Sequence, residues 1–277
     1  MAEQQTKERL QEVKGLFETP QWYLKGRSYH VQVRTAAVQH LLQGADFKRV
    51  LDIGCGDGSI SVPLLQPGRH LTLLDMSQAM LEIARSRVPA NLASAVEVIN
   101  SDVLGAKLPA ASFDVVICVG VFAYFPDPTP LIQKLHSILK PGGILIVECS
   151  DSAHFVTAMM RLYDRMKSIL AKPKFSTNPH TAKEIVDGFL ASGFQLNGSY
   201  RYSAPTRISR KLFSQPFHYW KIKTIFGEAA HPRCQSLGNE CIFWFKKLPE
   251  RAATGGKPSS RSPNQVETAP VVSQTSA

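Results

Sequence analysis

The hydrophobic positions of this chain follow two patterns that alternate between about residues 47 and 150. Short, nearly continuous apolar runs of strand length are separated by segments whose apolar residues recur at helical spacing. Strands that are buried on both faces have such runs, and their alternation with helices is typical of a parallel, doubly wound sheet. We therefore predict an α/β fold, with strands at residues 50–53, 70–75, 96–102, 113–120, 144–148, 194–203 and 240–247.

The first predicted strand runs into a loop in which glycine alternates with other residues, at Gly54, Gly56 and Gly58. Because glycine has no Cβ, the backbone here can adopt positive φ and come close to a bound molecule. Apolar residues at 60–65 predict a short helix after the loop, whose first N–H groups would face a ligand. This order of elements predicts a ligand cradle at the carboxyl ends of the strands.

The loop departs from the pattern of a dinucleotide-binding loop. That pattern, G-x-G-x-x-G, needs a third glycine where this chain has Ser59. Asp52 would also repel a pyrophosphate, whereas it suits a ligand that carries an amino group and a sulfonium. Residues 52–58 resemble motif I of the class I methyltransferases that use S-adenosylmethionine. The alternative is a glycine turn that merely joins a strand to a helix.

The ends of the next strands extend this resemblance. Asp75 follows the first glycine by about 20 residues, the spacing at which an adjacent strand places a carboxylate on ribose hydroxyls, and it would also suit the N-cap of a helix at 77–88. The resemblance implies that Met76 lies beside adenine and that Asp102 lies near the adenine amine. The cofactor contacts that it implies are Asp52, Gly54, Cys55, Gly56, Asp75, Met76, Asp102, Val103 and Val119.

The resemblance covers residues 45–150 well, extends more loosely to about residue 248, and is closest to the small-molecule branch, such as the quinone C-methyltransferases. It implies a Rossmann-like sheet of seven strands, the last antiparallel. It also implies an N-terminal helical cap (1–44), a cofactor-binding core (45–150) and a remainder with substrate-side lid insertions (151–250). Val-Gly-Val-Phe at 119–122 replaces the Asn/Asp-Pro-Pro-aromatic motif of enzymes that methylate amino groups of DNA bases, so that substrate class is disfavoured.

Aromatic residues and histidines supply the candidates for acceptor binding and catalysis. In the resembling family the N-terminal segments cover the cofactor, so Trp22, Tyr23, Tyr29 and His30 are expected to face the site, unless they pack the cap against the core. Tyr124 is the candidate beside the sulfonium. His30 and His218 are the candidates for a general base, because histidine titrates near neutral pH.

Composition bounds the remaining possibilities. The 277 residues carry a net charge of +10, which permits anionic partners, and five cysteines without C-x-x-C spacing indicate reduced thiols in a cytoplasmic protein. The sequence has no signal-like or membrane-spanning apolar run, so we expect neither secretion nor a membrane-spanning helix. Its histidines lack metal-ligand spacing, so we expect no metal. The tail, 251–277, is poor in large apolar residues and is predicted to be disordered.

Two segments lie outside the common pattern. An apolar stripe at 155, 159, 162, 166 and 169 predicts a helix packed on the body, or one that roofs a hydrophobic substrate. The second segment, residues 204–238, lies in a stretch from 201 to 251 that holds ten Lys or Arg against three acids, interleaved with aromatics. It suits an anionic lipid surface, RNA or a solvated lid, although Pro216 would interrupt a long helix.

The sequence therefore predicts methyl transfer from S-adenosylmethionine to a small and hydrophobic acceptor, in which the protein aligns the reacting atoms and excludes water. Two alternatives stay open. One is a nicotinamide-dependent oxidoreductase, if the loop tolerates Ser59. The other is a methyltransferase-like module that binds the cofactor or RNA without turnover. Nucleic acid is disfavoured as a partner, but the positive net charge permits it.

Overall fold

A computed structural model describes residues 14–15, 17–19, 28–168, 179–204 and 207–249. The predicted disordered tail and Tyr23 lie outside these residues. The elements are α3 (Ser28–Leu41), β1 (Arg49–Ile53), η1 (Val62–Leu64), β2 (His70–Asp75), α4 (Gln78–Ser86), η2 (Ala90–Ala95), β3 (Val96–Asn100), β4 (Phe113–Cys118), η3 (Phe122–Tyr124), α5 (Thr129–Ile138), β5 (Leu139–Ser150), α6 (Phe155–Ser168), α7 (Ala182–Ala191), β6 (Phe194–Tyr202), α8 (Arg207–Leu212), α9 (Gln215–Phe226), β7 (Gly227–Glu228), β8 (His231–Pro232), η4 (Gln235–Leu237) and β9 (Glu240–Lys247).

A seven-stranded sheet organises the molecule, with strand order β3-β2-β1-β4-β5-β9-β6. The strands from β3 to β5 are parallel, whereas β9 runs antiparallel to both of its neighbours. This confirms the predicted doubly wound sheet and its antiparallel last strand. The strand order reverses between β1 and β4, which makes the carboxyl ends of these two strands the expected place for a ligand.

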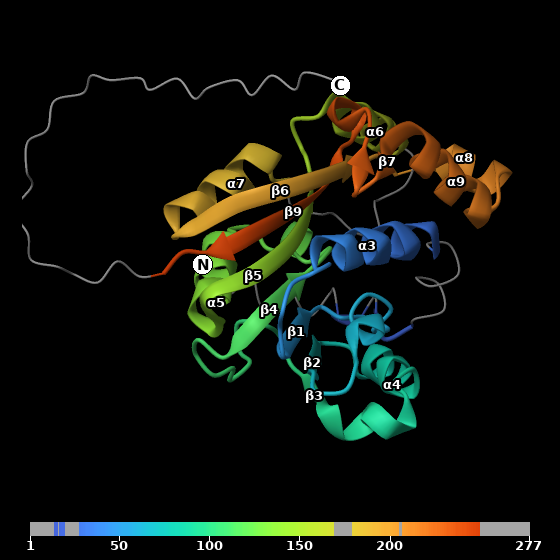
Figure 1. Cartoon of the computed structure of the whole chain (residues 1–277). Helices are drawn as coiled ribbons and strands as arrows, with labels where there is room; N and C mark the ends of the chain where they lie inside the picture. Colours follow the sequence, from blue (N-terminus) through green and yellow to red (C-terminus); the bar gives the residue numbers. More distant parts are fainter. Residues whose placement is uncertain (1–13, 16, 20–27, 169–178, 205–206, 250–277) are drawn as a thin grey trace, which may run out of the picture.

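Helices cover both faces of the sheet and create two hydrophobic cores (Figure 1). On one face α5 and α7 bury Leu131, Leu135 and Phe189 against the strands. On the other face α3, α4 and α9 bury residues such as Val38 and Leu81. The central strands contact apolar side chains on both sides, which is why β2 and β4 are apolar along nearly their whole length.

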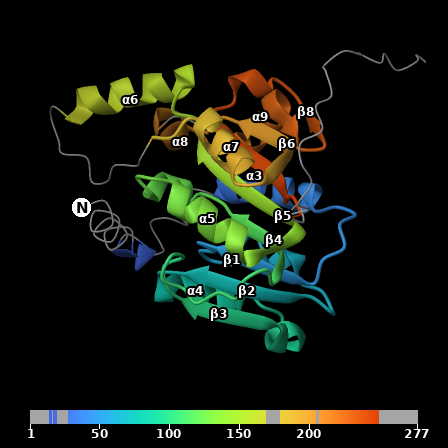
Figure 2. The same cartoon turned by 90° about the vertical axis from the view of Figure 1, so that its left-hand side faces the viewer.

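Two predicted helices need correction. The segment after the glycine loop forms only the 3-10 turn η1, because Pro63 stands at its start and Pro67-Gly68 follows immediately. The helix with the apolar stripe, α6, does not pack that stripe on the body: Phe155, Met159 and Leu162 are each about 60% exposed. Figure 2 shows α6 extending from the upper end of the molecule.

Smaller differences concern the ends of elements. Asp102 lies two residues beyond the end of β3, and the N-cap of α4 is Ser77, whose hydroxyl accepts a hydrogen bond from the Met80 N–H. Pro216 begins α9 instead of interrupting it, since the first turn of a helix tolerates a residue without an N–H group. A capping box formed by Thr181 and Glu184 opens α7.

Candidate functional site

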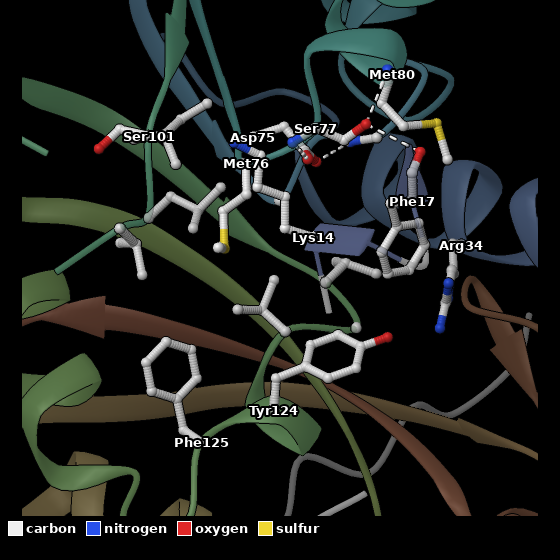
Figure 3. A pocket seen from close by; sticks show the side chains of 18 residues that line it. Lys14, Phe17, Arg34, Asp75, Met76, Ser77, Met80, Ser101, Tyr124 and Phe125 are labelled. Atoms are coloured by element: carbon white, nitrogen blue, oxygen red, sulfur yellow. Dashed lines mark hydrogen bonds between the residues drawn. The ribbon is translucent and has the colours of Figure 1, made fainter. Parts of the chain in front are cut away.

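A cavity opens at the carboxyl ends of β1, β2 and β4, next to the point where the strand order reverses (Figure 3). The glycine loop contributes Gly54 and Gly56, and the end of β2 contributes Asp75 and Met76. Its other walls come from the loops after β3 and β4, from α3 and from the N-terminal residues 14 and 17. The cavity therefore joins segments that are up to about 110 residues apart in the sequence.

The glycine loop owes its shape to backbone angles that other residues rarely adopt. Gly54, Gly56 and Gly58 all have positive φ, at 66°, 52° and 72°. A Cβ on Gly54 would lie 2.6 Å from Cγ2 of Val121, in the loop after β4. The N–H groups of Gly54 and Cys55 both donate to the carbonyl of Leu74, at 2.8 and 3.1 Å. At Gly54 the loop is thus pressed between the ends of β2 and β4, with no room for a side chain at that position.

Asp75 ties this loop to the start of α4. One carboxylate oxygen accepts the Gly56 N–H at 2.8 Å, and the other accepts the Ser77 N–H at 2.9 Å. Burial raises the pKa of Asp75, while these N–H groups oppose that shift. An ionised carboxylate can accept about four hydrogen bonds, so Asp75 can accept others from a ligand in the cavity that it lines.

Asp52 lies beneath the loop, inside the protein, and is 2% exposed. Its Oδ2 atom is buried and has no hydrogen-bond partner among the described residues. Burial raises the pKa of Asp52 to about 7, with a further contribution from the carboxylates of Asp75 and Asp57 and an opposing one from the Ser61 hydroxyl. A buried carboxylate with such an unpartnered oxygen favours a cationic group at the cavity, because such a group would stabilise the negative charge of the carboxylate.

Aromatic residues form the wall opposite Asp75. The rings of Phe17 and Tyr124 meet edge to face, with centroids 6.3 Å apart, and Phe125 lies next to them in the lining. Figure 3 shows Tyr124 and Phe125 across the cavity from Asp75 and Met76. The Phe17 carbonyl accepts a hydrogen bond from the Ser77 hydroxyl at 2.9 Å, which fixes the N-terminal segment over the cavity.

A buried polar network lies behind the cavity on the side of α3. The Arg34 guanidinium, which lines the cavity, pairs with Glu148 of β5 through two contacts, at 3.0 Å from Nε and 2.5 Å from Nη2. Tyr202 of β6 donates to the same carboxylate at 2.9 Å, and its hydroxyl lies 3.1 Å from Nδ1 of His30. Sequence reasoning missed this network, since its members are 54 to 172 residues apart and carry no common motif.

Residues 51–147 match the family model described as a methyltransferase domain. This part of the chain is similar to methyltransferase domains. A ubiquinone biosynthesis O-methyltransferase from Pseudomonas aeruginosa is 37% identical over 97 residues, which are 35% of this chain and 41% of that enzyme. The chain thus spans about two fifths of the length of the curated relatives it matches.

Solved structures extend the similarity of fold to most of the chain. The magnesium protoporphyrin IX methyltransferase from Synechocystis, crystallised with bound SAH, has a TM-score of 0.61 at 17% identity and covers 86% of this chain and 99% of its own. The cyclase SpnF has a TM-score of 0.53 at 20% identity and covers 77% of this chain and 79% of its own. The chain therefore has the Rossmann-like fold that these proteins share.

The cavity brings most of the predicted cofactor residues together. The cavity is lined by the predicted residues Gly54, Gly56, Asp75, Met76, Val103, Val119 and Tyr124. Asp52 lies beneath them. Asp102 is outside the lining, although both of its neighbours belong to it, because its carboxylate turns back to accept the Gly105 N–H at 2.7 Å. Cys55 is buried and also outside the lining, because it belongs to the hydrophobic core on the side of α3, α4 and α9.

The predicted acceptor and base residues of the cap need correction. Tyr29 is 1% exposed and packs in the core between α3 and α9, where its ring lies 5.6 Å from that of His218. His218 itself is fully buried on the inner face of α9. Neither residue belongs to the cavity lining, and nor does His30, whose Nδ1 lies 3.1 Å from the Tyr202 hydroxyl in the network behind the cavity. Helical periodicity turns these side chains toward the body because α3 and α9 pack on each other.

Among the described residues, no group of three or more His, Cys, Asp or Glu side chains is arranged to hold a metal ion. The same part of the chain contains no helix of sufficient length and hydrophobicity to cross a bilayer.

Proposed function

We propose that this chain transfers a methyl group from S-adenosylmethionine to a small, hydrophobic acceptor. The observation that carries the proposal is the position of the Asp75 carboxylate, which stands at the rim of the cavity between the glycine loop and α4. The similarity of residues 51–147 to a methyltransferase domain supports it, and so does the SAH bound by the Synechocystis enzyme. The activity itself is an inference from these observations.

The residues present fit this cofactor. Asp75 would hold the ribose hydroxyls, Met76 and Val103 would flank the adenine, and the bare backbone of Gly54 and Gly56 would face the methionyl part. Asp52, with its unpartnered buried oxygen, would favour the cationic groups of that part. The Arg34 guanidinium, also at the cavity, suits a carboxylate.

When bound, the cofactor supplies an activated methyl group. The chain's own residues then have two tasks. Phe17, Tyr124 and Phe125 provide an apolar wall that orients an acceptor and excludes water. Arg34 and Glu148 neutralise each other at the back of the cavity, so that this pair adds no net charge beside the acceptor. The described lining contains no histidine, so a hydroxyl acceptor would have to pass its proton to another group or to water.

The acceptor class follows from this wall. Aromatic and aliphatic side chains suit a small hydrophobic or aromatic compound. The relatives named for ubiquinone biosynthesis support an aromatic acceptor of the quinone-precursor type, although the match to them stops before the segments that follow residue 150. All five cysteines are free thiols, which supports the cytoplasmic location expected from the sequence.

Calorimetric titration with S-adenosylmethionine tests the cofactor half of the proposal, with NAD as the comparison. We expect binding of S-adenosylmethionine, a loss of at least tenfold in the Asp75→Ala variant, and no loss in Asp187→Ala, which removes an exposed carboxylate of α7. Heat with NAD and none with S-adenosylmethionine would favour the oxidoreductase alternative and overturn the proposal.

Turnover tests the second half. SpnF has this fold and is a cyclase, so the fold alone does not establish methyl transfer. We expect release of S-adenosylhomocysteine when the protein is incubated with the cofactor and a panel of small phenols, catechols and amines. Tight cofactor binding without release of this product for any acceptor would indicate a binding module.

A further inference from the structure

Helix α9 is apolar on two opposite sides. Its inner side buries His218, Ile222 and Phe226 against the body. Its outer side presents Phe217 and Trp220, which are 37% and 60% exposed. A surface helix needs only one apolar stripe to pack on its own protein, so the outer stripe calls for a second partner.

The outer side chains form one continuous row with the end of α8. The ring of Phe213 stacks on that of Phe217 with centroids 4.7 Å apart, and Phe217 meets Trp220 at 5.7 Å. Leu212, next to Phe213, is 70% exposed. Figure 1 shows α8 and α9 projecting at one corner of the molecule, beyond α3. The row is therefore accessible to a large, flat partner.

The charge around this row has one sign. Between residues 204 and 238 the sequence holds six Lys or Arg and a single acid, Glu228. That acid is already paired with Lys223. Lys221, one residue after Trp220, is exposed and lies on the same side of α9 as Phe217. A partner for this surface must accept aromatic and aliphatic side chains and carry negative charge.

We propose that the outer face of α8 and α9, formed by Leu212, Phe213, Phe217, Trp220 and Lys221, docks on the surface of an anionic lipid bilayer. Tryptophan and phenylalanine enter the boundary between head groups and acyl chains, and nearby lysines bind the acidic head groups. An RNA partner would use the charges but would not need exposed leucine, and a second copy of this chain would carry the same positive charge.

This surface connects to the cavity through α3. The inner side of α9 packs on α3, and α3 carries Arg34 into the cavity wall. Docking would hold the domain against the membrane at the segment next to its binding site. Docking on the bilayer does not depend on the proposed reaction. It would, however, give a hydrophobic acceptor a short path from the lipid to the cavity.

Vesicle flotation with the full chain tests the proposal. At about 0.1 M salt, where the Debye length is about 10 Å, we expect binding to vesicles of phosphatidylcholine with phosphatidylglycerol and little binding to phosphatidylcholine alone. Phe217→Ser combined with Trp220→Ser should reduce binding at least tenfold. Lys221→Glu should reduce it roughly thirtyfold, because it changes two units of charge at the surface.

Two controls keep the result specific. Lys107→Glu makes the same change of charge at an exposed site outside α8 and α9, and should bind as the unaltered chain does. Unfolding midpoints should stay unchanged in all variants, since the substituted side chains are exposed. Equal binding to neutral vesicles, full binding by the double variant, or no binding to either vesicle would each overturn the proposal. A dimer that the double variant dissociates, without vesicle binding, would assign the surface to a second copy.

Discussion

The loops at the carboxyl ends of β1, β2 and β4, here called the rim of the sheet, differ from the segments beyond residue 150 in the exposure of their apolar side chains. Around the glycine loop nearly every apolar side chain is buried, and the loops after β1 and β2 are joined by backbone groups and Asp75. Among the described residues, the large apolar side chains that remain exposed all lie after residue 150, chiefly on α6, α8 and α9.

This difference separates two kinds of constraint. The rim is determined by backbone geometry and by short contacts between neighbouring loops, and it coincides with the part of the chain that matches known methyltransferase domains. The later segments leave large apolar side chains exposed, and on α8 and α9 the proposed bilayer surface would cover them. Variants that act on one region and spare the other therefore test the comparison directly.

The largest effect should come from the ion pair that joins the cap to the sheet. Glu148 is 1% exposed and holds Arg34 and Tyr202 together. Glu148→Gln would remove the negative charge that pairs with the Arg34 guanidinium in a mostly buried position. We expect a loss of about 3–5 kcal/mol in the free energy of unfolding, measured by urea denaturation.

The matched control is Asp187→Asn, which makes the corresponding change in the exposed pair between Lys183 and Asp187 on α7. Exposed pairs of this kind contribute about 0.5 kcal/mol or less. A loss in Glu148→Gln that is no larger than the loss in the control would contradict the assignment of Glu148 as the joint between the cap and the sheet.

The next effect concerns Asp52 and pH. Burial raises the pKa of Asp52 to about 7 from a usual value of 3.8, so the folded protein holds a proton there that the unfolded chain has released. This contribution to stability is complete below about pH 4 and is lost as pH rises through about 7. The slope should reach up to about 1.4 kcal/mol per pH unit in this window.

Asp52→Asn should remove that slope, because asparagine has no proton to lose. Urea denaturation of both proteins at a series of pH values would measure the difference between their free energies of unfolding. We expect the variant to gain stability relative to the unaltered chain as pH rises from about 4 to about 7. Two parallel profiles would mean that Asp52 is ionised throughout, for example through a partner outside the described residues.

The rim and the later segments also differ in how well their structure can be predicted from the sequence. The strands, their order of appearance and the loop at 54–58 could be predicted because apolar runs and glycine spacing are local signals. The position of Asp75 followed from its place at the end of a strand that neighbours the glycine loop. The network of Arg34, Glu148 and Tyr202 could not be predicted, since it depends on pairing between distant segments.

Helical periodicity misled the sequence analysis in the later segments. It identifies an apolar face of a helix but does not tell whether the protein itself covers that face. The stripe on α6 is regular and yet exposed, whereas Tyr29 and His218, which were expected at the site, fill the core between α3 and α9. Hydrophobic and aromatic residues of this kind have the same pattern in a core and at a partner surface.

A smaller effect should separate strain from close packing at the glycine loop. Gly54→Val should weaken binding of S-adenosylmethionine by roughly thirtyfold, because the new side chain collides with Val121 and distorts the loop. Gly44→Val is the control: Gly44 also has positive φ, at 76°, but a Cβ there meets nothing within 4 Å. Gly44→Val should lose about 1–2 kcal/mol of stability from backbone strain alone, Gly54→Val should lose more because the collision adds to that strain, and only Gly54→Val should lose affinity in a calorimetric titration.

The smallest effect should come from α6. Phe155 is 60% exposed, so Phe155→Ala removes little contact with the body and should change the free energy of unfolding by less than about 0.5 kcal/mol. Phe189→Ala makes the same change in a side chain that is fully buried on α7, and should cost about 3–5 kcal/mol. If thermal or urea unfolding gave similar losses for the two variants, α6 would be packed on the body and the contrast between rim and outer segments would fail there. A near-zero loss at Phe155 would leave its apolar face available to an acceptor or a partner, because the fold does not need it.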